Sequence, residues 1–277
     1  MPKSFGRRLQ EAFETHGQLC VGIDPHASLL ADWGLADNAT SLVEFGRRVI
    51  EASAGRVGVI KPQVSFFERF GAEGFAALEI VTNEARDAEL LVIADAKRGD
   101  IGTTMSAYLD AWFGGVSGFY ADALTVSPYL GAGVYLDQMA HYLERGKGLF
   151  SLVATSNPEG YAVQKAVAAD LWDELGETNR VTAGAGDKLG SFGAVVGATI
   201  QSARYGIDSL ATTPVQTPIL APGFGAQGAK LADIKLLFPG AYEGVVASVS
   251  RSVLEAGPHG LAEAIDSHKA ELAAGLE

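Results

Sequence analysis

Residues 90–101 read LLVIADAKRGDI, an apolar run that ends abruptly in charges. The first five residues of this stretch have the character of a buried strand. Positions two apart share one face of a strand, so Asp95 and Lys97 are predicted to point the same way. Asp100 lies just past the strand end, where the chain turns. Because taking charges out of water is costly, two carboxylates around one ammonium at the mouth of a buried strand indicate a functional site.

The same arrangement recurs along the chain, where short apolar runs are followed by polar residues. The runs at 19–23, 57–60, 149–154, 219–221 and 242–249 lead, in turn, into Asp24, Lys61, Thr155-Ser156-Asn157, Pro222 to Gly225, and Ser250-Arg251. Continuous apolar runs are typical of strands buried on both faces of a parallel sheet. Polar groups at the carboxyl ends of many such strands are typical of a (β/α)8 TIM barrel. The sequence therefore predicts this α/β fold.

Eight strand–helix alternations can be placed on the chain, as a parallel sheet with crossover helices requires. The predicted strands lie near 18–24, 57–63, 90–97, 121–127, 148–155, 192–199, 217–222 and 242–249. The predicted helices lie near 41–54, 68–86, 103–114, 131–144, 162–176, 200–206, 227–238 and 260–275. No Pro- or Ser-rich linker interrupts the chain, so we expect a single domain over residues 1–277. Residues 157–191 exceed a simple loop plus helix and are predicted to contain an insertion.

Composition and charge exclude several classes of protein. The net charge of -12 disfavours binding to nucleic acid or to an anionic membrane. No apolar run approaches the roughly 20 residues that span a bilayer, and the N-terminus lacks the apolar segment of a signal peptide. The lone cysteine, Cys20, excludes an intramolecular disulfide and is typical of a reducing compartment. We therefore expect a cytoplasmic protein.

Residues 223–228, GFGAQG, match the pattern G-x-G-x-x-G. The dinucleotide-binding form of this pattern follows the first strand of its fold, whereas this one follows the seventh predicted strand. TIM barrels frequently bind phosphate with the loops after strands 7 and 8. Glycine lets backbone amides approach an anion, and Arg251 can add a bidentate guanidinium. A phosphate site is therefore predicted at this loop.

Other site chemistries find little support. The five histidines form no pair with metal-ligand spacing, and His26 alone lies near a predicted strand mouth. No G-x-S-x-G elbow of a serine hydrolase occurs. Cys20 is predicted to be a small core residue. Nothing in the sequence demands a metal or an organic cofactor.

These features resemble the orotidine 5'-phosphate decarboxylase family, in its longer bacterial form, over nearly the whole chain. Residues 95–101, DAKRGDI, match the D-x-K-x-x-D-I signature of the family's third barrel strand. Lys61 is similar to the lysine that completes the family's Lys-Asp-Lys-Asp array. Two features depart from the family pattern. Gly102-Thr103 replaces the Pro-Glu often found after the signature, and the segment 157–191 has no counterpart in shorter members.

The resemblance implies cofactor-independent decarboxylation of orotidine 5'-phosphate to uridine 5'-phosphate in pyrimidine biosynthesis. Lys97 would be the cation beside C6 and its proton donor, Asp95 would hold Lys97 near the departing carboxylate, and Lys61 would keep Asp95 ionised. The implied substrate-binding residues are Asp24 for the ribose, Ser156 for the pyrimidine, and Pro222, Gly223, Gly225, Gln227 and Arg251 for the phosphate.

The resemblance also implies a homodimer with shared active sites, in which Asp100, Ile101 and Thr104 complete the partner's site. Two alternatives stay open at this point. One is a sister barrel with the same D-x-K-x-x-D strand, a sugar-phosphate decarboxylase or synthase that uses Mg²⁺. The other is an inactive barrel that only binds a phosphorylated metabolite, against which the complete charged array argues.

Overall fold

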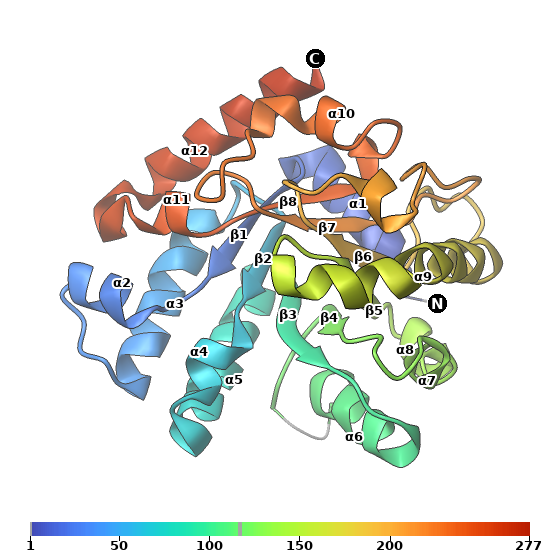
Figure 1. The fold of residues 1–277 in the computed structure, drawn as a ribbon. Coiled ribbons are helices and arrows are strands. Elements are labelled where there is room, and N and C mark those ends of the chain that lie inside the picture. Colours follow the sequence, from blue (N-terminus) through green and yellow to red (C-terminus); the bar gives the residue numbers. More distant parts are fainter. Residues whose placement is uncertain (1, 116–117) are drawn as a thin grey trace.

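Eight parallel strands close into a barrel in chain order, with β8 hydrogen-bonded back to β1 (Figure 1). The computed structural model describes residues 2–115 and 118–277. The strands are β1 (Leu19–Ile23), β2 (Val59–Pro62), β3 (Leu91–Arg98), β4 (Ala123–Val126), β5 (Gly148–Ala154), β6 (Phe192–Val196), β7 (Ile219–Pro222) and β8 (Val245–Val249). Each overlaps its predicted range, and the predicted (β/α)8 fold is confirmed.

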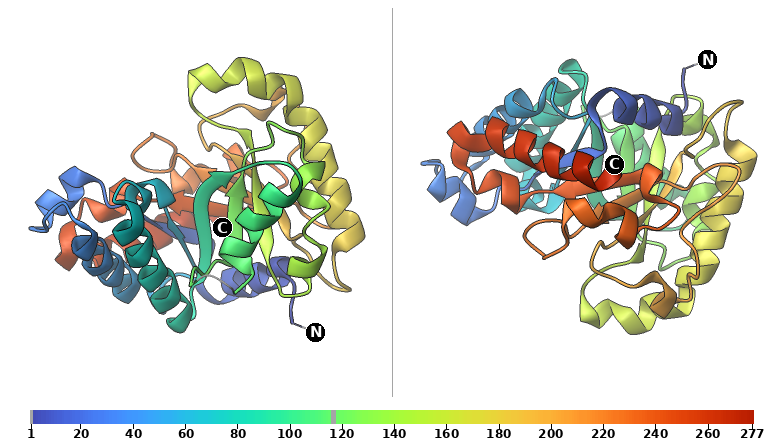
Figure 2. Two further views of the ribbon diagram at one scale, coloured as in Figure 1. Left: turned by 90° about the horizontal axis from the view of Figure 1, so that it is seen from below. Right: turned by 90° about the horizontal axis from the view of Figure 1, so that it is seen from above.

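Helices surround the barrel (Figure 2). They are α1 (Phe5–His16), α2 (Ala27–Asp32), α3 (Ala39–Ser53), α4 (Val64–Glu68), α5 (Gly71–Asp87), α6 (Gly102–Phe113), α7 (Gly133–Leu136), α8 (Ala140–Leu143), α9 (Tyr161–Thr182), α10 (Ile234–Leu237), α11 (Arg251–Leu254) and α12 (Gly257–Leu276), with 3-10 turns η1 (Pro158–Gly160), η2 (Ser202–Tyr205), η3 (Leu231–Asp233) and η4 (Tyr242–Gly244). Within the described residues, no helix combines the length and the apolar character needed to cross a membrane.

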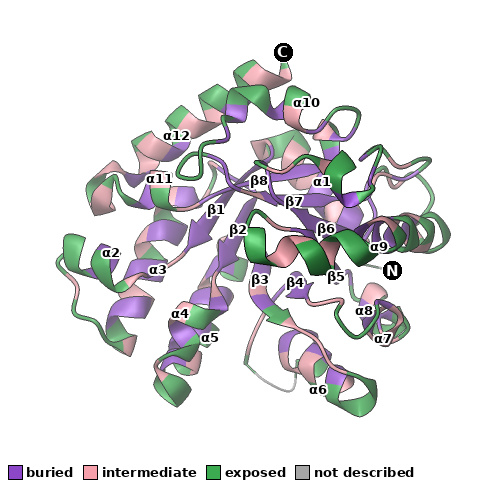
Figure 3. Cartoon of the chain, in the orientation of Figure 1, coloured by how far each residue is buried: buried purple, intermediate pink, exposed green. Residues whose placement is uncertain are grey.

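Alternation along the strands divides the core into two parts. One set of strand side chains fills the barrel, and the other packs outward against the helices, so the strands are buried on both faces (Figure 3). The interior set includes Cys20, Val59, Leu91, Ile93, Ala123, Phe150, Val195, Leu220 and Val246. Counting two or four residues on from the interior positions Cys20, Val59 and Ile93 leads to Asp24 just past β1, Lys61 in β2 and Asp95 in β3. The alternation that builds the interior therefore also aims these charges into the barrel mouth.

Helix α1 closes the end of the barrel opposite this mouth and was not predicted. Its residues Phe5 and Leu9 join the interior cluster, and the Phe5 ring meets Phe150 edge-on at 5.9 Å. Ser4 caps the helix by accepting a hydrogen bond from the Arg7 amide. The helix precedes the first strand, so the strand–helix alternation gave no signal for it.

Three predicted helices are shorter than expected. The range 131–144 contains only α7 and α8, 200–206 contains the 3-10 turn η2, and 227–238 contains η3 and α10. Such short segments gain little from their own hydrogen bonds, and their apolar residues are instead anchored by the barrel. Tyr135 of α7 is an example, because its hydroxyl reaches the buried Ser151 hydroxyl at 2.8 Å.

Residues 157–191 form most of the connection from β5 to β6 and consist largely of α9, which is longer than the predicted helix at 162–176. The turn at 184–187 after α9 is docked onto the N-terminus of α1. The Asp187 carboxylate accepts hydrogen bonds from the Ser4 hydroxyl at 2.7 Å and from the Gly184 amide at 3.0 Å. That this segment is an insertion relative to shorter members of the family stays a prediction.

Candidate active site

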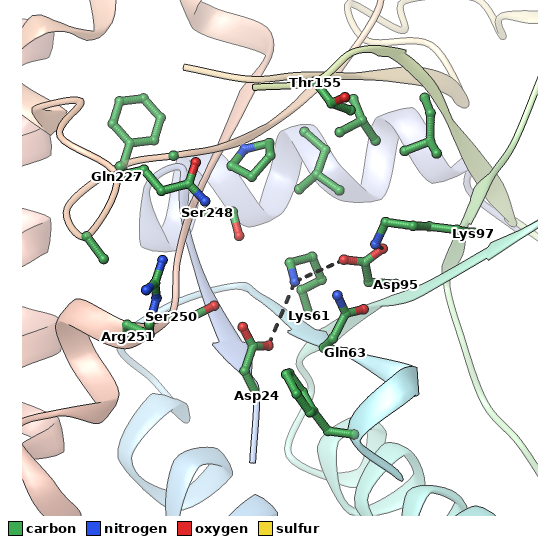
Figure 4. A pocket seen from close by; sticks show the side chains of 18 of the residues that line it. Asp24, Lys61, Gln63, Asp95, Lys97, Thr155, Gln227, Ser248, Ser250 and Arg251 are labelled. Atoms are coloured by element: carbon green, nitrogen blue, oxygen red, sulfur yellow. Dashed lines mark hydrogen bonds and ion pairs between the residues drawn. The ribbon is translucent and has the colours of Figure 1, made fainter. Parts of the chain in front are cut away.

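A cavity of about 500 Å³ opens at the carboxyl ends of the strands (Figure 4). Its floor is apolar and is formed by Leu152, Val195 and Leu220. Its walls carry charged and polar groups that come from β2, β3 and β8 and from the segments that follow β1, β2, β5, β7 and β8. Eight predicted site residues line it: Asp24, Lys61, Asp95, Lys97, Pro222, Gly223, Gln227 and Arg251.

Asp95 lies between two lysines. The Lys97 Nζ donates to Asp95 Oδ1 at 2.5 Å, and the Lys61 Nζ lies 3.4 Å from Asp95 Oδ2. Asp95 and Lys61 are nearly buried, whereas the Lys97 side chain is 45% exposed toward the cavity. Burial by itself would raise the pKa of Asp95, but the charges of Lys61 and Lys97 outweigh it and hold that pKa below its usual value. Asp95 is therefore an anion under ordinary conditions.

Lys61 also faces a second carboxylate, because its Nζ lies 4.0 Å from Asp24 Oδ1 (Figure 4). Burial disfavours the charged ammonium, yet the attraction of Asp24 and Asp95 dominates and raises the pKa of Lys61. Asp24 Oδ1 is buried and accepts no hydrogen bond from any residue that the structure describes. A buried acceptor without a donor is costly, so this oxygen is suited to a donor brought by a ligand.

Gln63 is a cavity residue that the sequence analysis did not select. It follows Lys61 by two positions and forms a parallel bridge with Asp95. With its amide nitrogen facing Asp95, it donates to the Asp95 carbonyl oxygen at 2.6 Å and to Oδ2 at 3.2 Å. The period-two alternation that placed Lys61 could have found it.

The loop after β7 is a tight turn in which all three glycines of the G-x-G-x-x-G pattern have positive φ: 118° at Gly223, 70° at Gly225 and 98° at Gly228. Only glycine adopts such angles at little cost. Gly225 also packs closely on Ser252, whose Oγ would lie 2.5 Å from an added Cβ. The pattern thus shapes a loop that carries Gln227 into the cavity, on the same side as Arg251 (Figure 4).

Five predicted site residues do not line this cavity. Asp100 and Ile101 lie between β3 and α6, and Thr104 lies in the first turn of α6. Ile101 is 59% exposed, and the Asp100 carboxylate accepts a hydrogen bond from the Ile101 amide. Gly225 belongs to the loop after β7 but is not among the residues that line the cavity. Ser156 lines a neighbouring cleft, and its hydroxyl donates to Oε1 of the cavity residue Gln227 at 3.2 Å.

Other cavity residues were not among the predicted ones. They are His26, Phe66, Thr155, Phe224, Ala226, Ser248 and Ser250, besides Gln63 and the apolar floor. Ser248 and Ser250 continue the inward alternation of β8, and Thr155 directly follows β5. Alternation along β8 and the end of the apolar run of β5 could therefore have predicted these three residues as part of the site. His26 packs on Phe66 with ring centroids 4.1 Å apart, a contact that no sequence pattern announces.

Gly102 explains one departure from the family pattern. Its φ is +53°, and it begins α6. Proline, with φ fixed near -65°, could not adopt this conformation.

The lone thiol, Cys20, is buried in the barrel interior. Burial raises the pKa of Cys20 to about 12, so it is an un-ionised core residue, as predicted. Within the described part of the chain, no three His, Cys, Asp or Glu side chains gather in an arrangement that could hold a metal ion.

Comparisons with known proteins match most of the chain to one family. Residues 17–265 match the model of the orotidine 5'-phosphate decarboxylase / HUMPS family. The chain is 51% identical over 258 residues to the orotidine 5'-phosphate decarboxylase of Streptomyces coelicolor, which covers 92% of this chain and 91% of the relative. It is 47% identical over 263 residues to the enzyme of the same name from Salinispora arenicola, with 92% and 91% covered.

Solved structures of similar proteins superpose on the whole chain. A crystal structure from Streptomyces avermitilis, provisionally described as an orotidine 5'-phosphate decarboxylase, superposes with a TM-score of 0.91 at 48% identity and covers 100% of this chain and 97% of its own. The OMP decarboxylase of Leishmania donovani superposes with a TM-score of 0.77 at 29% identity, with 99% of both chains covered.

Proposed function

Because this chain belongs to the orotidine 5'-phosphate decarboxylase / HUMPS family, we propose that it converts orotidine 5'-phosphate to uridine 5'-phosphate and carbon dioxide without a cofactor. The observation that carries this proposal is the Lys61–Asp95–Lys97 array inside a cavity that also presents a phosphate-type loop. The relatives that share 42–51% of the sequence bear the decarboxylase name, which favours this reaction over the Mg²⁺-dependent sugar-phosphate chemistry of a sister barrel. We also propose that the enzyme works in the cytoplasm, for which the lone, buried thiol is the supporting feature.

The cavity suggests how the substrate lies. The phosphate is held by the loop at Gly223 and by Gln227 and Arg251, which lie together at one side (Figure 4). The ribose hydroxyls donate to Asp24, whose buried Oδ1 lacks a donor from the described residues. We also assign Ser156 to the pyrimidine: it lies in the neighbouring cleft and is linked to the cavity by its hydrogen bond to Gln227. This order leaves the C6 carboxylate of the pyrimidine beside Asp95 and Lys97.

The reaction breaks the bond between C6 and the carboxylate carbon, and the electron pair stays on C6. Carbon dioxide leaves as this bond breaks, and the Lys97 ammonium stabilises the developing carbanion. Lys97 then gives C6 its proton, and the neutral amine is reprotonated from solvent. Such stabilisation is strong because the cation is already fixed where the charge develops. Asp95 fixes the ammonium at 2.5 Å, and Lys61 keeps Asp95 ionised. Binding of the remote phosphate supplies energy for closing the site around the base.

We further propose a homodimer with shared active sites. Asp100, Ile101 and Thr104 do not line the cavity of their own chain, and the large apolar side chain of Ile101 is exposed. In a twofold dimer each subunit would give these residues to its partner and receive the same ones.

The test of the reaction is turnover of orotidine 5'-phosphate by the purified protein, followed by loss of the substrate's ultraviolet absorbance. We expect full turnover after dialysis against EDTA. Loss of activity in EDTA with recovery in Mg²⁺ would instead indicate the chemistry of the sister barrels. Binding of phosphorylated ligands without any turnover would leave only a binding protein.

A further inference from the structure

Thr125 is a buried hydroxyl behind the charged array. It lies in β4, two residues after the interior residue Ala123, and is 0% exposed. It does not line the cavity. Nevertheless its Oγ1 makes two hydrogen bonds to residues of β3. It accepts from the Lys97 backbone amide at 2.9 Å and donates to Asp95 Oδ1 at 3.0 Å.

The backbone that it holds is unusual. Lys97 has φ of +50°, a conformation that residues with a Cβ adopt reluctantly. The pairing of β3 with β4 shifts register between Ala94 and Arg98, so the ladder does not supply an ordinary partner at Lys97. A conformation of this kind persists only where its surroundings hold it in place. The Thr125 hydroxyl is the acceptor that the structure provides for the Lys97 amide.

The direction of the two bonds follows from the chemistry of a hydroxyl, which has one proton and two lone pairs. The Lys97 amide can only donate, so it occupies a lone pair and leaves the Thr125 proton free for the Asp95 carboxylate. The Thr125 hydroxyl therefore hydrogen-bonds both the Lys97 backbone and the Asp95 carboxylate, which in turn forms the ion pair with the Lys97 ammonium. Valine, which has the same shape, would fill the space and make neither bond.

We propose that Thr125 is a positioning residue for the decarboxylation: its hydroxyl fixes the left-handed turn at Lys97 and the Asp95 carboxylate in one geometry, so that the Lys97 ammonium is aimed at C6. This inference rests on the proposed function for the identity of the reaction. The hold on the Lys97 backbone can be measured apart from it.

The decisive comparison is Thr125→Val against Thr125→Ser, with Thr217→Val as the matched control. Thr217 is also a fully buried threonine, but it lies before β7 and bonds Asn179 and Thr212 instead of the site. We expect Thr125→Val to lower kcat by about 10- to 100-fold with little change in KM, since a small misplacement of a reacting group has effects of this size. Thr125→Ser and Thr217→Val should keep kcat within about threefold of the wild type, because both leave the site's hydroxyl in place.

Two further measurements separate positioning from simple loss of stability. Hydrogen exchange of the Lys97 amide should become faster in Thr125→Val and not in Thr125→Ser. The acidic limb of the pH–rate profile should move to higher pH in Thr125→Val, because Asp95 loses a donor that favours its charged form. The charged groups that face Asp95 are Lys61 and Lys97, with Asp24 behind Lys61, and they are the same in every variant.

Thr125→Ala serves as a second variant without the hydroxyl if the valine form does not fold. The proposal is overturned if a folded hydroxyl-free variant has kcat within twofold of the wild type, or if its Lys97 amide exchanges at the wild-type rate. If the wild type itself does not turn over orotidine 5'-phosphate, the proposed function fails. The exchange measurement then still decides whether Thr125 holds the Lys97 backbone.

Discussion

Lys147 is a buried lysine at the end of the barrel opposite the cavity. Its Nζ donates to the Ala121 carbonyl at 2.6 Å and lies 4.3 Å from the centre of the Tyr120 ring. Beside it, Arg8 and the fully buried Asp122 form an ion pair at 2.6 Å. Burial lowers the pKa of Lys147 to about 8, although Asp122 partly opposes this shift. The folded protein therefore releases this proton more easily than the unfolded chain.

The sign of the effect on stability follows from linkage. Below pH 8 the lysine is charged in both states and the cost of burying the charge is fully present. Between pH 8 and the ordinary value of 10.5, the unfolded chain binds more protons, so the free energy of unfolding rises with pH. Between pH 7.5 and 9.5 we expect it to rise by about 1–2 kcal/mol more in the wild type than in Lys147→Met. Urea unfolding at both pH values measures this difference.

Comparison with Lys147→Met is the control for other groups, since Cys20 and Tyr142, with pKa values raised to about 12, oppose this rise in both proteins. An identical pH dependence in the two proteins would show that burial does not lower the pKa of Lys147.

Helix α1 approaches the backbone of residues 189–190 closely at Gly6, where a larger side chain would not fit. A Cβ on Gly6 of α1 would lie 2.0 Å from the Leu189 carbonyl oxygen and 2.6 Å from that of Gly190. These are backbone atoms and cannot move aside cheaply. We therefore expect Gly6→Ala to lower the free energy of unfolding by about 1–3 kcal/mol, as overpacking does. Equilibrium unfolding in urea measures the loss.

Gly176→Ala on α9 is the matched control. There the nearest atom to an added Cβ is Thr212 Cγ2 at 3.5 Å, an ordinary contact. Alanine is the better helix former, so this change should stabilise the protein by about 0.5–1 kcal/mol. Opposite signs for the same substitution in two helices would confirm that the fit of α1 against the barrel end decides the effect. A neutral Gly6→Ala would show that α1 can shift without cost.

The assembly of the whole molecule can be tested by complementation. Lys97→Ala and Asp100→Ala are each expected to be inactive alone. If the dimer shares its sites, a mixed dimer has both lesions in one site and a native second site. After subunit exchange of an equal mixture, we expect activity to return to about a quarter of the wild-type level, since half of the dimers are mixed and each has one native site. Native mass spectrometry measures the exchange.

The control mixes Lys97→Ala with Lys61→Ala. Both lysines belong to the array of one chain, where they flank Asp95, so every site in this mixture keeps one lesion and no activity should return. Demonstrated exchange without recovery in the Asp100 mixture would mean that Asp100 acts within its own subunit.

Much of this arrangement was predictable from the order of residues along the chain. Apolar runs that end in Asp24, Lys61 and Asp95 predicted the strands, and the position of these charges at the carboxyl ends of the strands predicted that they share the barrel mouth. The reason is that burial acts on each strand locally. A strand that is buried on both faces must be apolar until it reaches the barrel mouth. The first charged residue after the apolar run therefore predicts the end of the strand. The three glycines of 223–228 are likewise typical of a loop with positive φ angles, which the structure has at each of them.

Only the tertiary structure decided how distant segments meet. Thr125 meets Asp95 and Lys97 because the register of β3 against β4 shifts within the pair, and Gln63 reaches Asp95 through a bridge from β2. The closure of the barrel by α1 depends on a fit between Gly6 and residues 189–190. Such contacts join residues about 30 to 180 positions apart, and their energies depend on geometry between elements. A pattern within one element reports its own burial, whereas the hydrogen bond that holds the Lys97 turn exists only once two strands are aligned.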